Sequence, residues 1–175
     1  MATARRGGKV GGQNWERTTM QSTSDGLEPI RLILEDADLS GWIHVPDQRM
    51  TDLLQTGEPF SFLPAGIDGA EWSDVYPDET VLVVPPPYVS PPELRVPRNQ
   101  HQVFIRAGRF RVEGTAYLRP GEQDDPILRA TRRFLPLTQA TFACDDRPDE
   151  QVDVVIVNLR RVDEFVPLTR ADQST

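Results

Sequence analysis

The chain of 175 residues is poor in the residue types that most catalytic and metal sites use. Cys144 is the only cysteine, so an intrachain disulfide and a zinc site built from cysteines of one chain are excluded. His44 and His101 are the only histidines, and aromatic residues make up 7% of the chain. The acidic clusters match no calcium-loop spacing. We therefore expect no metal site, no cofactor and no enzymatic activity.

Long apolar runs are also missing. No stretch is long enough for a transmembrane helix, and the N-terminal residues lack the apolar core of a signal peptide. These absences predict a cytoplasmic protein without a membrane partner. With 16 prolines, 12 glycines and 38% hydrophobic residues, the composition favours short strands and loops over long helices. Residues 1–26 carry Gly, Ser and Thr without apolar periodicity, which predicts a disordered tail.

The remaining sequence contains an internal repeat. Four segments recur in the same order, each displaced by 72 to 74 residues. The matched pairs are Leu39–Val45 with Val112–Leu118, Leu53-Leu54 with Ile127-Leu128, Phe62–Pro64 with Phe134–Pro136, and Val81–Val84 with Val154–Val157. We therefore predict a tandem duplication, with a first β-rich repeat at residues 27–94 and a second at residues 95–170.

Each repeat predicts the same short elements. A strand is expected at Arg31–Glu35 and at Gln102–Ala107, and a short helix at Met50–Gln55 and at Pro126–Arg132. The segment that follows each strand alternates apolar and polar residues, which indicates a half-buried antiparallel strand. A unit of about 65 residues buries too little surface to be stable alone. The predicted fold is mainly β, with two copies of a small antiparallel barrel or sandwich unit, each with one short helix, packed as a pseudo-twofold pair.

The first repeat carries three short motifs in the order Gly41–Pro46, Arg49–Leu54 and Phe62–Pro64. Together they resemble a small bacterial domain family of unknown function. The resemblance covers mainly residues 31–89 and, more loosely, the second repeat. It implies no activity. The second repeat departs from the pattern, because Thr115 stands where Trp42 does and Arg119 where Pro46 does.

Charge is divided unevenly between the repeats. Residues 27–94 hold two Arg and 13 acidic residues, a net charge of −11, whereas residues 95–133 hold nine Arg and four acidic residues, a net charge of +5. Opposite patches can attract one another within a chain or between chains. Between chains they favour head-to-tail contacts, which close into rings or extend into filaments. Simple solubility is the alternative explanation of the acidic first repeat.

Trp42 is the residue most suggestive of a binding surface. If Ile43 faces the core, Trp42 faces away from it, and exposed Trp is enriched at interface hot spots. The alternative is that the other repeat covers Trp42. His44 lies on the same face and is expected to be a surface or interface residue. No nucleophile motif accompanies it, so it is not expected to act as a general base.

An outward stripe of Arg109, Arg111, Thr115, Tyr117 and Arg119 in the second repeat suggests a different partner. Arg and aromatic residues on a sheet face are how many small barrels hold single-stranded nucleic acid. Glu113 interrupts this stripe, and the net charge of −8 also disfavours nucleic acid. We therefore predict a non-enzymatic interaction or assembly protein that binds partner proteins or itself. A nucleic-acid-binding module is the alternative, and a small ligand-binding barrel is the least favoured one.

Overall fold

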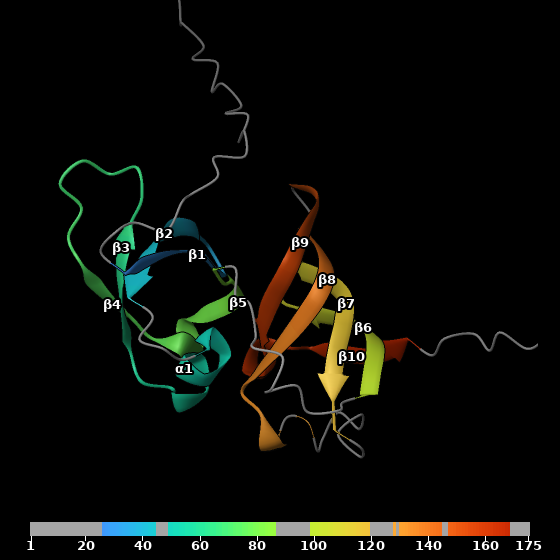
Figure 1. The fold of residues 1–175 in the computed structure, drawn as a ribbon. Coiled ribbons are helices and arrows are strands. Elements are labelled where there is room, and N and C mark those ends of the chain that lie inside the picture. Colours follow the sequence, from blue (N-terminus) through green and yellow to red (C-terminus); the bar gives the residue numbers. More distant parts are fainter. Residues whose placement is uncertain are drawn as a thin grey trace, which may run out of the picture.

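The structure is a computed structural model. It describes residues 26–44, 49–86, 99–119, 128, 130–144 and 147–168. The predicted disordered tail lies outside the described residues except for Gly26, and so do Val45 and most of the connector between the repeats. Within the described ranges, the chain is mainly β, and ten antiparallel strands form one sheet (Figure 1).

Each half of the chain contributes five strands. The first half contains β1 (Leu27–Leu34), β2 (Asp38–His44), α1 (Met50–Thr56), β3 (Phe60–Pro64), β4 (Ser73–Val75), the 3₁₀ turn η1 (Pro77–Glu79) and β5 (Thr80–Val84). The second half contains β6 (Asn99–Ala107), β7 (Phe110–Leu118), β8 (Phe134–Cys144), β9 (Arg147–Asn158), the 3₁₀ turn η3 (Leu159–Arg161) and β10 (Glu164–Leu168).

The predicted helices lie at corresponding places. The first is confirmed as α1, which ends at Gly57 in a left-handed conformation that glycine adopts readily. Of the second predicted helix, Leu128, Ala130 and Thr131 are helical. Residues 126, 127 and 129 of that prediction lie outside the described part of the chain. Leu54 and Leu128 are both fully buried, so each helix closes one side of a core.

The two halves have the same strand order. Across the sheet the order is β10-β6-β7-β8-β9-β5-β1-β2-β3-β4. Each half is therefore a meander with its fifth strand returned to pair with its first, so that β10 corresponds to β5 and β9 to β4. A 3₁₀ turn precedes the returning strand in both halves.

Strand pairing aligns the halves residue by residue. Gly41 opposes Ile30 in the first half, and Gly114 opposes Val103 in the second, an offset of 73 on both strands. Both glycines lie where the third strand of their half comes close. A Cβ at Gly41 would collide with the carbonyl oxygen of Leu63, and one at Gly114 would lie 3.1 Å from the Cβ of Leu137. A side chain is excluded or disfavoured at both places for the same reason.

Two of the four sequence matches do not coincide with this pairing. Ile43 opposes Phe62, and its counterpart Ala116 opposes Leu137, so Leu137 rather than Phe134 takes the place of Phe62. The strand β5 corresponds to β10, whereas Val154–Val157 belongs to β9. The reason is that β8 and β9 form a longer hairpin than β3 and β4. The sequence offset between equivalent residues of the two halves therefore increases from 73 in the first strands to 82 in the last strand.

The strands β5 and β9 join the halves and lie side by side between them (Figure 1). Leu82 opposes Val157, and Val83 opposes Ile156. Because neighbouring residues of a strand point to opposite faces, Leu82 and Val157 enter one apolar cluster and Val83 and Ile156 enter the other. Each half thus supplies side chains to the core of the other.

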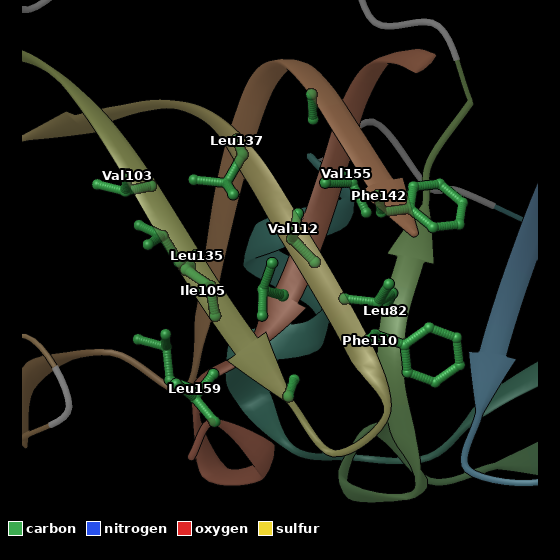
Figure 2. Close-up of a cluster of buried hydrophobic side chains, with 14 of the residues drawn as sticks. Leu82, Val103, Ile105, Phe110, Val112, Leu135, Leu137, Phe142, Val155 and Leu159 are labelled. Carbon is green, nitrogen blue, oxygen red and sulfur yellow. The ribbon is translucent and has the colours of Figure 1, made fainter. Parts of the chain in front are cut away.

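The larger cluster contains residues of the second half together with three from the first. The contributions from the first half are Ile33, Val81 and Leu82. Leu82 of β5 points into the cluster that also holds Val112 and Val155 (Figure 2). Phe134 and Ile156 of the second half enter the smaller cluster in return. The helices and strands are therefore arranged around two apolar cores, and the central strands β5 and β9 contribute side chains to both.

The contact between the halves joins unlike edges. A twofold axis would bring like edges together, either β5 with β10 or β4 with β9. The observed contact pairs β5 with β9, which holds the place of β4 in its own half. The predicted pseudo-twofold pair of barrels is therefore not confirmed, and the contact is head to tail. No helix in the described residues is long and apolar enough to cross a membrane.

Candidate interaction face

An apolar row crosses three strands on the outer face of the first half. Pro29 of β1 opposes Trp42 of β2, which in turn opposes Leu63 of β3. Their chain neighbours Ile43 and Phe62 are buried in the smaller cluster, so the row points away from that core. All three side chains of the row are half-buried. Trp42 therefore faces away from its own core and is not buried by the second half.

A stacked aromatic pair extends this row. The rings of His44 and Trp72 are stacked, with centroids 5.2 Å apart and an interplanar angle of 18°. His44 follows Trp42 by two residues on β2 and shares its face. Trp72 is 43% exposed, which is unusual for so large an apolar side chain. We call Pro29, Trp42, His44, Leu63 and Trp72 together the aromatic face.

The equivalent place in the second half is polar. Strand pairing puts Gln102, Thr115 and Thr138 where the first half has Pro29, Trp42 and Leu63. The amide Nε2 of Gln102 donates to the hydroxyl of Thr115 at 2.7 Å, and the hydroxyl of Thr138 donates to the Thr115 carbonyl at 3.5 Å. Thr115 is buried. The apolar row is thus a property of the first half alone.

The Arg stripe of the second half does not form one continuous basic surface. Arg109 lies in the turn before β7, with its guanidinium 5.2 Å from the centre of the Phe110 ring, whereas Tyr117 and Arg119 lie at the far end of that strand. The stripe therefore extends over about 30 Å. Exposed Glu113 lies between Arg111 and Tyr117.

One basic pair on this face is compact. Arg111 directly opposes Arg106 across β6 and β7. Arg106 forms an ion pair with Glu164 at 3.6 Å, whereas Arg111 is exposed and has no carboxylate partner among the described residues. This pair therefore combines two adjacent guanidinium groups with one carboxylate.

Ion pairs between the halves confirm part of the predicted pairing of arginines with acids of the other half. The carboxylate of Asp78 in η1 accepts from Arg133 at 2.6 Å and from Arg160 at 2.8 Å. On the opposite side of the junction, Arg31 binds Glu150 as well as Asp38 of its own half. The hydrogen bonds to Asp38, with help from Glu150, raise the pKa of the Arg31 guanidinium above its usual range despite burial.

A groove lies beside Arg31 between the halves. Its walls include Asp38, Arg109, Phe142, Cys144 and Glu150. At its centre Arg31 forms ion pairs with both carboxylates. Cys144 is buried, and within the described ranges no three His, Cys, Asp or Glu side chains are placed to hold a metal ion.

Among the residues that the structure describes, neither histidine is paired with a nucleophile. In the described part of the chain, the side chain of His44 contacts the ring of Trp72, and the buried Nε2 of His101 has no hydrogen-bond partner. Sequence reasoning identified Trp42 and His44 but missed Pro29, Leu63 and Trp72. Trp72 was predictable only as an aromatic residue in an acidic loop, because the contact with His44 depends on the fold.

Comparison with protein-family models, with curated proteins and with solved structures finds no match for this chain. The resemblance to a small bacterial domain family therefore stays a prediction. The geometry of the described residues shows an outer surface that is apolar and aromatic in the first half and polar at the equivalent place in the second.

Proposed function

We propose that this is a non-enzymatic interaction protein whose first half binds a partner protein through the aromatic face. The single observation that carries the proposal is the contrast between equivalent surfaces. The row of Pro29, Trp42 and Leu63 is apolar and accessible, whereas its counterpart at Thr115 is polar and internally hydrogen-bonded. Packing alone does not require a half-buried apolar row at this place, because the second half is built without one.

The surroundings of the aromatic face define the chemistry of the partner. The first half carries a net charge of −11 over residues 27–94, and exposed Glu71 and Asp74 lie beside Trp72. Complementary charge guides association and excludes wrong partners, while buried aromatic side chains supply most of the affinity. The expected partner is therefore a protein surface with an apolar centre and a basic rim.

The test is quantitative affinity capture with a matched pair of variants. Trp42→Thr gives the first half the residue that the second half has at Thr115, and Tyr117→Thr changes an exposed aromatic residue at the place equivalent to His44. We expect Trp42→Thr to lose a defined partner and Tyr117→Thr to retain it. The proposal fails if both variants capture the same proteins as the unaltered chain in equal amounts.

We also propose that the chain arose by tandem duplication of one small barrel-like unit. The repeated strand order, the repeated 3₁₀ turn and the two crowded glycines, Gly41 and Gly114, support this origin. The units then diverged on their outer faces, where Trp42 corresponds to Thr115. Duplication followed by divergence is a simple route from one binding surface to two different ones.

Binding of single-stranded nucleic acid is the second candidate, and the adjacent Arg106 and Arg111 favour it. If these side chains bind phosphate, affinity for a labelled oligonucleotide falls by roughly 0.7 log units per log unit of salt for each contact. Fluorescence anisotropy over a salt series measures this slope. Binding that is lost on Arg109→Ala with Arg111→Ala would favour the nucleic-acid function over the protein-binding one.

A further inference from the structure

The contact between the two halves is a template for a contact between two chains. It joins a fifth-strand edge, β5, to a fourth-strand edge, β9. The sheet ends at one free edge of each kind, since β10 corresponds to β5 and β4 corresponds to β9. We propose that β10 of one copy pairs with β4 of a second copy, so that the protein self-associates head to tail through its sheet edges.

Strand register shows which residues would meet. Leu32 of β1 and Ile105 of β6 are equivalent residues. Leu32 opposes Val83 and Ile105 opposes Phe165, so Phe165 is the counterpart of Val83. By the same register, Glu164 is the counterpart of Leu82. Proline can block edge pairing because it lacks an N–H. Pro167 corresponds to Pro85, which lies beyond the residues that pair in the observed junction. The proline of β10 therefore leaves the pairing segment available.

The fourth-strand edge presents matching positions. Phe60 of β3 and Leu135 of β8 are equivalent residues. Phe60 opposes Val75 and Leu135 opposes Val157, so Val75 is the counterpart of Val157. By the same register, Asp74 is the counterpart of Ile156. Those two residues of β9 form the observed pairs with β5. Among the described residues, nothing pairs with the outer side of β4 or of β10. Both edges therefore present backbone groups that are free to join another strand.

Exposed apolar side chains lie at both of these edges. Among the described residues, Tyr76 directly follows β4, and Val166 and Leu168 lie on β10; all three side chains are exposed. Unpaired edges of monomeric proteins are normally protected by charge or by covering segments. Apolar side chains at both ends indicate instead that each edge has a partner.

The two edges also differ in charge. Residues 65–79, which contain β4, hold five acidic residues and no basic one, whereas residues 99–119, which form β6 beside β10 and β7 next to it, hold four Arg and one acidic residue, and β10 adds Glu164. Opposite charge favours contact between unlike edges and opposes contact between like ones. A contact that joins unlike edges leaves one of each kind free on every chain, so it continues into a ring or a filament.

The test is sedimentation velocity of the full chain over a series of concentrations, up to about 1 mM at low salt. We expect the mean mass to rise past that of a dimer with concentration, and to fall as salt screens the opposite charges. A mass that stays at one chain throughout overturns the proposal. Trp42→Thr leaves both edges intact and is expected to self-associate normally. The variant therefore distinguishes a failure of the partner-binding proposal from a failure of the self-association proposal.

Two edge variants identify the contact. Val166→Glu with Leu168→Glu makes β10 acidic, and Asp74→Arg with Tyr76→Arg makes β4 basic, so each edge repels its unaltered partner. Each double variant alone is expected to lose self-association. A mixture of the two regains it, because the unaltered β4 of one variant meets the unaltered β10 of the other. All four side chains are exposed, and thermal melting verifies that the variants fold.

The control is Tyr117→Glu, which introduces an acid on the outer face of the second half away from both free edges, and it is expected to self-associate normally. Loss of association in only one of the two edge variants would show that like edges pair, which contradicts the head-to-tail contact. Association that persists in both edge variants, or a mixture that stays monomeric, would also overturn it.

Discussion

Asp78 and Arg160 occupy equivalent positions in the two halves, and they form an ion pair with each other across the junction, with 2.8 Å between Oδ2 and Nη1. Their equivalence follows from the register, since Val75 corresponds to Val157 and the turns η1 and η3 begin two residues later in both halves. The turn η1 directly precedes β5 and the turn η3 directly follows β9, so both turns lie at the same end of this antiparallel junction, where their opposite charges attract one another.

Replacing Asp78 by Asn is expected to lower the free energy of unfolding by about 1 kcal/mol. The Arg133 side chain is largely buried and loses its anionic partner, but the Asp78 carboxylate is half exposed and solvent screens part of the interaction. Urea denaturation measures the change. The control is Asp74→Asn, which removes only an exposed contact with Ser61 and should change stability by less than about 0.5 kcal/mol. Equal effects of the two substitutions would contradict the role of Asp78.

Alanine at the two crowded glycines is expected to have unequal costs. At Gly41 the new Cβ meets the backbone oxygen of Leu63, which cannot move without breaking the pairing of β2 with β3. Gly41→Ala should therefore cost about 3 kcal/mol or more. At Gly114 the nearest atoms are 3.1 to 3.3 Å away, on Leu137 and Ala140, and Gly114→Ala should cost about 1 kcal/mol. Chemical denaturation measures the loss of unfolding free energy in both variants. A larger loss for Gly114→Ala than for Gly41→Ala would contradict this prediction.

The second half is not expected to fold alone. A fragment of residues 99–175 loses Ile33, Val81 and Leu82 from the larger cluster and exposes Ile156, which the first half normally covers. We expect this fragment to aggregate or to melt without cooperativity. A monomeric fragment with a sharp thermal transition would show that the shared strands are not needed for the core.

The sequence predicted the repeat where both halves meet the same local constraint. Gly41 and Gly114 each sit in an alternating strand under a close third strand, so that pattern survives in both copies. The returning strand was not recognised in the second half. It is central in the first half and reads Val81–Val84, but it is a free edge in the second and reads Phe165–Leu168 with an exposed proline. The residue types of β5 and β10 therefore follow from how far neighbouring strands bury each one, and not from their equivalent positions in the two halves.

The interaction face was predicted only in part for a similar reason. The alternation around Ile43 placed Trp42 and His44 on the outer side of β2, and the structure agrees. Pro29 and Trp72 lie 13 and 30 residues from Trp42, and only strand register and the loop before β4 bring them to it. Likewise, the sequence showed an excess of Arg over residues 95–133, but it did not show that Arg133 and Arg160 meet a single carboxylate.

The most direct measurement of the proposed function is hydroxyl-radical footprinting of the chain alone and of its complex with the captured partner. The account predicts that oxidation of Trp42 and Trp72 falls in the complex, while oxidation of Tyr117 on the second half stays unchanged. Both tryptophans are accessible in the chain alone, so their protection requires a partner over the aromatic face. Protection of Tyr117 with unchanged oxidation of Trp42 and Trp72 would contradict the account, because the partner would then occupy the Arg-bearing face of the second half.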